Sequence, residues 1–416
     1  MPRRVMGALL SAKSNDVTAW RATEDFSAKY RQHLLDRAGS DRTIGAQGVF
    51  SESLAALEEL STAHKKILLK LDTLLDEVAT APPTVRLKEL TSEYYATLYR
   101  HMDVFHSAPA FYQKSMEFMS LLGRAVMTHS ADQLGPLAGN LPKMALVALG
   151  PAGRCEYSPF CQLQLLLVHE EISGAQLQTI NRYSHAVHAE FEEIGLVIDP
   201  VVSPRNPEWR GSLSEWQQRC DDALYHTDPD DLINVLRLAD QYSLTPDEDL
   251  AHKLKERVLA TLRGSRAAQA NLVERMESLS NGIGVMGGLK LERSGDGRGL
   301  FRLLDHGLLP LSAALSALAL IKGSSATSSC DRIYDLLKRR ELDVDLAEKM
   351  LEAWYCIHEL RLRHEQSLSI AGHTHQSLLL NPGELSLGQR QSLKASLEAV
   401  ATIQRHVAVT FSGMGD

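Results

Sequence analysis

The sequence predicts an α+β protein: a helical N-terminal region, a central mixed sheet with helices, and a C-terminal helical bundle. Two short apolar runs, residues 144–149 and 163–168, flank the turn Gly150-Pro151-Ala152-Gly153-Arg154, and their length and flanking turn residues indicate buried strands. Long stretches on both sides of these runs instead repeat apolar residues at helical spacing. We therefore expect a helical region over 1–135, a sheet-containing domain over 136–225 and a helical domain over 226–416.

Composition and charge are those of an ordinary globular protein. Of the 416 residues, 44% are hydrophobic and 23% are charged, and the length allows a sizeable core. The net charge of −8 argues against a general nucleic-acid-binding surface. The five cysteines show no metal-ligand spacing, and no apolar run reaches membrane-spanning length. We expect reduced thiols in a cytoplasmic protein whose partner is neither nucleic acid nor a membrane.

The N-terminal region is expected to be entirely helical. Apolar residues form a one-sided stripe over 15–37, and the polar, glycine-containing stretch over 38–48 indicates a loop. Residues 51–80 repeat leucine at helical spacing and are long enough for an antiparallel pair of helices. Two more helices are expected over 84–105 and 110–129, and their stripes of Leu and Tyr are typical of core packing.

The second apolar run begins with Gln162-Leu163-Gln164. Side chains two residues apart on a strand point to the same face, so both amides are expected to face one cleft. A third strand is expected over 195–202, and it carries Asp199. Arg154 and Glu156 close the turn, either as a phosphate-binding or structural pair at the mouth of the cleft, or as a surface ion pair of little energetic value.

This layout resembles the polymerase-β-type nucleotidyltransferases, in which an apolar strand ends in Gly-Ser and a second strand carries Asp-x-Asp. The match is closest to the signal-transduction nucleotidyltransferases related to the PII-uridylyltransferases. Their pattern Gly-Ser-x-Gly-Arg-x-Glu is similar to Gly150-Pro151-Ala152-Gly153-Arg154-Cys155-Glu156. The resemblance includes Asn206-Pro207-Glu208-Trp209 and Ser212-Leu213-Ser214-Glu215-Trp216, and it covers about residues 110–411. It implies a transferase fold followed by a helical substrate-binding domain, with Gly150, Gly153 and Arg154 at the nucleotide.

The sequence departs from that family at the positions that carry its chemistry. Gln162 and Gln164 replace the two aspartates, and Pro151 replaces the serine. Nucleotidyl transfer uses two divalent cations held by carboxylates, and Mg²⁺ gives up its water reluctantly to a neutral amide. Proline offers phosphate neither a hydroxyl nor an N–H group. The resemblance makes Asp199 the candidate third carboxylate, which alone cannot hold two metal ions.

The helical domain retains some family residues and lacks others. The helix expected to begin near Thr227 carries Tyr242 in its buried stripe and, by the resemblance, Val235 in place of an aspartate. The positions of Asp-x-Lys hold Arg302 and Leu304, and an arginine expected near Ser316 is absent. The family residues that are retained are Arg237, Arg332, Arg361, Arg363 and His364.

Other patterns in the C-terminal half have structural interpretations. The run Gly282–Gly287 fits G-x-G-x-x-G, but a helix rather than a strand precedes it, so the signal for a dinucleotide site is weak. Residues 289–304 are typical of a hairpin. Helices are expected over 310–322 and 344–370, and a last one follows the capping pair Ser386 and Gln389. His373 and His375 lack a ligand partner at metal spacing, so solvated or hydrogen-bonded histidines are the better interpretation.

The function favoured by these observations is a catalytically degenerate nucleotidyltransferase that acts as a regulatory or signal-transduction binding protein. We expect no metal site and no cofactor, with Mg²⁺ and a nucleoside triphosphate only if activity persists. The partners expected are a nucleotide or a regulatory protein, and a homodimer is left open. One alternative is an active transferase that uses other acids, such as Glu156, Asp199 or Glu192. A second alternative is a helical scaffold.

Overall fold

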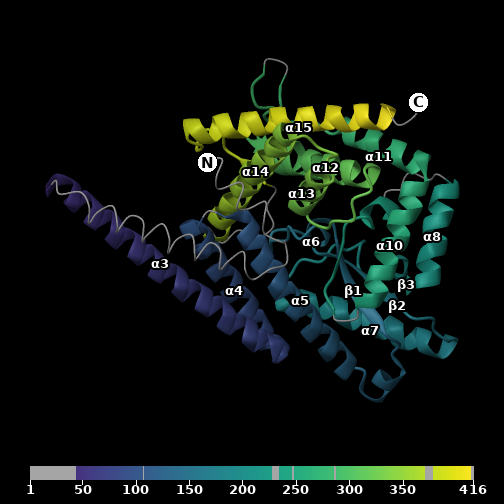
Figure 1. Ribbon diagram of the computed structural model, residues 1–416. Coiled ribbons are helices and arrows are strands. Elements are labelled where there is room, and N and C mark those ends of the chain that lie inside the picture. Colours follow the sequence, from purple (N-terminus) through teal and green to yellow (C-terminus); the bar gives the residue numbers. More distant parts are fainter. Residues whose placement is uncertain are drawn as a thin grey trace. The chain divides into compact units, whose positions relative to one another are not determined.

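The computed structural model describes residues 44–105, 107–226, 234–245, 248–284, 287–370 and 378–413. The chain divides into two compact units, Met1–Lys70 and Leu71–Asp416. In the second unit, helices surround a small mixed sheet and continue into a helical C-terminal part, which confirms the predicted α+β class (Figure 1). The helix predicted over 15–37 lies outside the described residues.

The N-terminal helices differ from the prediction in their lengths. Helix α3 is one helix over Ile44–Ala79, not the pair predicted over 51–80, because no glycine or proline interrupts the sequence from residue 51 to Ala79. The predicted loop over 38–48 is wrong from Ile44 onward and lies outside the described residues before it. Helices α4 (Thr84–Phe105) and α5 (Ala108–Asp132) confirm the next two predictions.

The sheet contains four strands in the order β3-β2-β1-β4. Strand β1 is Met144–Leu149, as predicted, and β2 is Gln164–His169, one residue later than predicted. These two strands are antiparallel, and Leu149 is opposite Gln164. Strand β3 (Arg210–Ser212) runs parallel to β2, whereas β4 (Gln241–Ser243) is antiparallel to β1.

The strand predicted over 195–202 is wrong, since only Ile198 forms a bridge there, with Leu163. The Asp199 carboxylate accepts the N–H groups of Val201 and Val202, which turns the chain away from a strand ladder. The helical position predicted for Tyr242 is also wrong. Residues 234–237 are helical, and the chain then turns so that Tyr242 pairs with Ala148. This pairing gives hydrogen-bond partners to the backbone groups on the second edge of β1.

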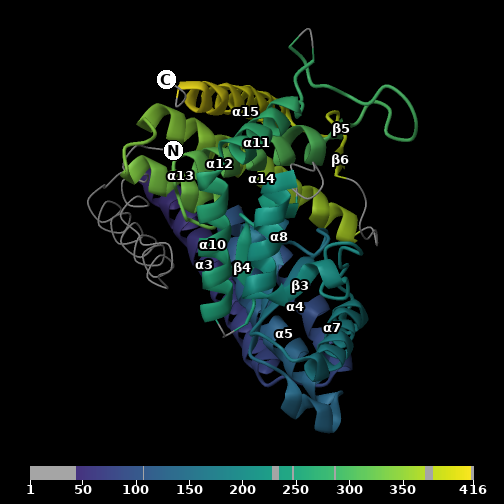
Figure 2. The same cartoon turned by 90° about the vertical axis from the view of Figure 1, so that its right-hand side faces the viewer.

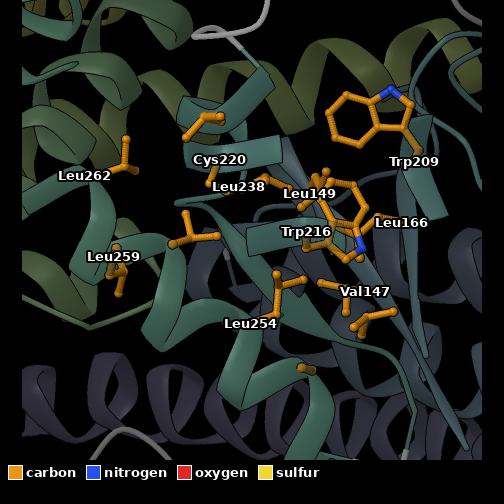
Figure 3. Packing of buried hydrophobic residues seen from close by; sticks show 14 of the residues in the cluster. Val147, Leu149, Leu166, Trp209, Trp216, Cys220, Leu238, Leu254, Leu259 and Leu262 are labelled. Atoms are coloured by element: carbon orange, nitrogen blue, oxygen red, sulfur yellow. The ribbon is translucent and has the colours of Figure 1, made fainter. Parts of the chain in front are cut away.

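One face of the sheet packs against α8 (Leu213–His226) and α10 (Glu248–Gly264). Figure 3 shows Val147, Leu149 and Leu166 of the sheet beside Trp216 of α8 and Leu254 of α10. The opposite face lies toward α5, where the Tyr242 hydroxyl is 3.4 Å from that of Ser120. Helix α7 (Gly174–Ile194) packs with α4 and α5 and confirms the helix predicted after the second strand.

The C-terminal helices confirm the predicted helical bundle and its capping pair. Ser386 and Gln389 form the predicted capping box of the last helix, and Ser212 and Glu215 form another at the start of α8. The Gln404 amide donates to the backbone oxygens at the end of α11, so the last helix lies along the bundle (Figure 2). The helices are α11 (Arg266–Ser278), α12 (Leu309–Ile321), α13 (Ser329–Lys338), α14 (Val344–Ile370) and α15 (Leu387–Gly413).

The predicted hairpin over 289–304 is present in reduced form, closed by a bridge between Leu291 and Phe301. Strand β5 (Phe301–Arg302) pairs with β6 (Leu379–Leu380), and the segment before β5 projects from the bundle (Figure 2). Within the described residues, one stretch, Leu304–Ile321, is long and apolar enough to cross a membrane. Most of it is buried in the bundle, as in the core helix of a folded domain.

Candidate functional site

The turn after β1 brings its backbone close to the first residue of β2. Gly150 has φ +58°, a conformation that favours glycine, and it begins the short helix α6 (Gly150–Gly153). A Cβ atom on Gly150 would lie 2.6 Å from Oε1 of Gln164. Pro151 fits the first turn of this helix because its missing N–H group would have no partner within the helix. The glycine therefore serves both the turn and the approach of Gln164.

Gln164 joins the turn to Asp199. Its Nε2 donates a hydrogen bond of 2.9 Å to Oδ2 of Asp199, while its Oε1 lies against Gly150. Gln162 precedes β2 and is exposed, Gln164 is partly buried, and Leu163 between the two amides is buried. The structure thus brings Gly150, Gln164 and Asp199 together and leaves Gln162 at the exposed end of this group.

Asp199 is already held by three N–H donors. Its Oδ1 accepts from the backbone of Val201 at 2.9 Å and of Val202 at 3.0 Å, and its Oδ2 accepts from Gln164. Partial burial by itself would raise the pKa of this carboxyl, but the hydrogen bonds and the charge of Arg237 lower it below the usual value. The hydrogen bonds that the Asp199 carboxylate accepts therefore mainly stabilise the conformation of the neighbouring chain.

Arg154 and Glu156 form a buried ion pair. The Arg154 Nε donates to Oε2 of Glu156 at 3.1 Å, and its Nη1 donates to Oδ2 of Asp240 at 2.9 Å. The Trp354 indole N–H donates to the other oxygen of Glu156 at 2.9 Å. The surface-pair interpretation is therefore wrong, because both side chains are largely buried and link the turn to α14.

Asp240 extends this network to α12 and α13. The Arg332 Nη2 donates to Oδ1 of Asp240 at 2.6 Å, and the Ser316 hydroxyl lies 3.2 Å from the same oxygen. Burial by itself would raise the pKa of Asp240, but Arg332 and Arg154 hold it below its usual value. Arg332 matches a family arginine, and Ser316 stands where the family pattern has another. Both side chains therefore contact the same carboxylate, that of Asp240.

A second buried cluster lies around Arg361 on α14. Its Nε donates to Oε1 of Glu365 at 2.7 Å, its Nη2 to the Ser158 hydroxyl at 2.7 Å, and its Nη1 to the Glu156 backbone oxygen at 3.3 Å. The Tyr99 hydroxyl of α4 donates to the second oxygen of Glu365. One buried carboxylate and its arginine therefore hold together three parts of the chain. These are residues 94–105 of α4, the segment that follows α6, and helix α14.

Gly153 makes the closest backbone approach in the turn. A Cβ atom there would lie 2.1 Å from the Asp240 backbone oxygen and 2.9 Å from that of Ala148. No other residue fits between these two carbonyl groups without moving the backbone. The geometry of Gly153 accounts for its place in the motif through packing against the segment that leads into β4.

Two family models match the two parts of the chain that this network joins. Residues 94–230 match the family described as "Putative nucleotidyltransferase DUF294", and residues 266–411 match "Putative nucleotidyltransferase substrate binding domain". Together they cover more than half of the chain. The chain belongs to this nucleotidyltransferase family. No curated protein matches it.

The residues at the expected metal position of this nucleotidyltransferase-family chain do not fit a two-cation centre. Gln162 and Gln164 are neutral, and Asp199 is engaged by three N–H donors. Among the residues that the structure describes, no group of three or more His, Cys, Asp or Glu side chains is arranged to hold a metal ion. Mg²⁺ requires carboxylate oxygens that neutralise its charge, and this donor set supplies one at most.

Some partners in the nucleotidyltransferase-family network were missed by sequence reasoning. Glu365 is four residues after Arg361 on a helix, a spacing that predicts an ion pair, whereas Asp240 has no local signal. Val235, in the position of a family aspartate, is buried in the apolar core.

The remaining predicted residues lie elsewhere. Arg302 and Leu304 are exposed at the start of the segment leading into α12. His358 is buried, and its Nδ1 atom lies 2.8 Å from the Tyr112 hydroxyl, within hydrogen-bond distance. Burial lowers the pKa of His358 to about 3. His373 and His375 lie outside the described residues.

Proposed function

We propose that this nucleotidyltransferase-family chain has lost nucleotidyl transfer and acts by binding, as a regulatory or signal-transduction component. The observation that carries the proposal is the Gln164–Asp199 pair. Gln164 stands at a position that is aspartate in the family pattern, and its side-chain N–H group donates a hydrogen bond to the carboxylate of Asp199. Such a pair stabilises the local structure, and it leaves too few free carboxylate oxygens to bind two cations.

Two further observations support the loss of transfer. Pro151 stands where the family serine would offer a hydroxyl and an N–H group to phosphate. The Arg154 guanidinium donates to Glu156 and Asp240, so its charge is already neutralised within the protein. The turn therefore keeps Gly150, Gly153 and Arg154 of the family pattern but lacks the groups that would handle a triphosphate.

An active transferase with other acids has less support. Glu156 is buried between Arg154 and Trp354, so substrate would have to break that network to reach it. Glu192 lies on α7 with its carboxylate 3.3 Å from Nε2 of His188. Neither carboxylate hydrogen-bonds to Asp199 or Gln164 among the described residues.

A labelling assay tests the proposal. The full chain is incubated with each of the four α-labelled ribonucleoside triphosphates, Mg²⁺ or Mn²⁺, and a PII-type protein or amino-sugar acceptor. We expect no covalent label above a reaction that contains EDTA. Metal-dependent label that falls at least tenfold in Asp199→Asn, with Glu193→Gln as an exposed control, would contradict the proposal.

A further inference from the structure

Lys255 lies where α10 meets the loop before α13. Its side chain is half-buried, and its Nζ donates a hydrogen bond of 2.7 Å to the Thr327 hydroxyl. Thr327 belongs to the hydroxyl-rich loop Gly323-Ser324-Ser325-Ala326-Thr327-Ser328 that leads into α13. An ammonium group has three N–H donors. Lys255 therefore has donors beyond the one that Thr327 accepts.

The charges next to Lys255 are already paired with one another. On α13, Arg332 is held by Asp240, and Arg154 shares that same carboxylate. Lys255 itself forms no ion pair with any of the described residues. The groups that face it are Arg332, the Cys155 thiol after α6, and Asp240 before β4. Asp331 also acts on Cys155 through its charge, but it forms no ion pair with Lys255.

The lack of a counter-ion has an energetic consequence. Burial, and then repulsion by Arg332, lower the pKa of Lys255 to about 8, although Cys155 and Asp240 oppose that change. Burying a charge without a partner is unfavourable, and an anion bound beside it would relieve the cost. Lysine is a common point-charge ligand for phosphate, and a hydroxyl group completes such a site.

We propose that Lys255 and Thr327 bind the phosphate group of a ligand. The side chain of Lys255 is partly exposed, and its hydrogen bond to Thr327 is partly buried. The ligand is a nucleotide or free phosphate, which share this chemistry. This inference goes beyond the proposed loss of transfer, because Gln162, Gln164 and Asp199 take no part in it.

The test measures anion binding without divalent metal. Melting curves and titration calorimetry are run in EDTA at constant ionic strength with inorganic phosphate, pyrophosphate, ATP and adenosine as probes. We expect at least one phosphate-bearing probe to bind, adenosine not to bind, and Lys255→Met to weaken binding about tenfold or more. Lys253→Met is the matched control, since Lys253 is exposed on the same helix and pairs with Asp249.

The relative affinities identify the source of the phosphate. Tighter binding of ATP than of pyrophosphate identifies a nucleotide, and binding of ATP no tighter than that of pyrophosphate or inorganic phosphate identifies a free phosphate; either supports the site. The inference is overturned if no phosphate-bearing probe binds the parent, or if Lys255→Met and Lys253→Met bind equally well. Because the assay contains no metal and measures no transfer, its outcome is independent of the labelling assay.

A pH series gives a second readout that does not depend on ligand. The Lys255 pKa is about 8 in the folded chain, against an ordinary value of 10.5, so between these values the unfolded chain binds more protons. The free energy of unfolding should therefore rise with pH across this window in the parent relative to Lys255→Met. Phosphate should flatten that rise, because it stabilises the charged lysine. An identical pH profile for parent and variant would show that Lys255 is an ordinary solvated lysine.

Discussion

Replacing Arg361 with methionine is expected to lower the free energy of unfolding by about 3 to 5 kcal/mol, the usual cost of removing one partner of a buried ion pair. Arg361 supplies Glu365 with its only cation within 4 Å among the described residues. Without it, the only donors left to this buried carboxylate among the described residues are the hydroxyls of Ser158 and Tyr99. Urea denaturation followed by circular dichroism measures the loss.

The same helix provides the control. Arg363 is exposed and pairs with Glu359 at 2.7 Å, and such surface pairs contribute about 0 to 1 kcal/mol, so Arg363→Met should be nearly neutral. Adding Glu365→Gln to Arg361→Met should recover part of the loss, because it removes the unpaired charge. Equal stability of Arg361→Met and Arg363→Met would show that the buried cluster does not hold α14 to the sheet domain.

The second large effect is expected from Gly153→Ala. The added Cβ would meet the Asp240 backbone oxygen at 2.1 Å, and a backbone group cannot rotate away as a side chain can. Either α6 or the segment before β4 must shift, at a cost of about 1 to 3 kcal/mol for an overpacked site. The shift would also lengthen the Arg154–Asp240 contact, so the melting temperature should fall clearly.

Gly139→Ala serves as the reference for that substitution. A Cβ atom on Gly139 would meet no atom within 4 Å, so this change should stay within about 0.5 kcal/mol of the parent. If Gly153→Ala melts at the same temperature as Gly139→Ala, the close packing of α6 against the segment before β4 is not present in solution.

The parts of the fold that were predicted correctly depend on local patterns. Strand β1 is a continuous apolar run between breakers, and α14 and α15 carry long apolar stripes, so neighbouring residues alone specify them. The error at Tyr242 arose because a distant partner decides the structure there. Tyr242 continues a helical stripe, yet it pairs with β1, almost a hundred residues earlier in the chain.

The candidate site was predictable residue by residue but not as an assembly. The motif identified Gln164 and Asp199 separately, and nothing in the sequence indicates that the amide donates to a carboxylate 35 residues away. The same holds for Arg332 and Asp240, which are 92 residues apart. The sequence alone also suggested a surface pair for Arg154 and Glu156 as readily as a buried one, because burial depends on α13 and α14.

The most direct test of the central claim, that this family fold lacks its metal chemistry, is a Mg²⁺ titration of thermal melts for the parent and for Gln162→Asp combined with Gln164→Asp. The carboxylate introduced at position 164 would lie beside Asp199 and repel it, the second at position 162 would add negative charge at the exposed end of this group, and a bound cation would relieve the repulsion. At ten times its dissociation constant, Mg²⁺ would add about 1.4 kcal/mol of stability, which for a chain of this length is a rise of about 2 °C. We predict that rise in the double variant alone, with no return of nucleotidyl transfer. An equal Mg²⁺ response in both proteins would show that Gln162 and Gln164 do not occupy a shared former metal site.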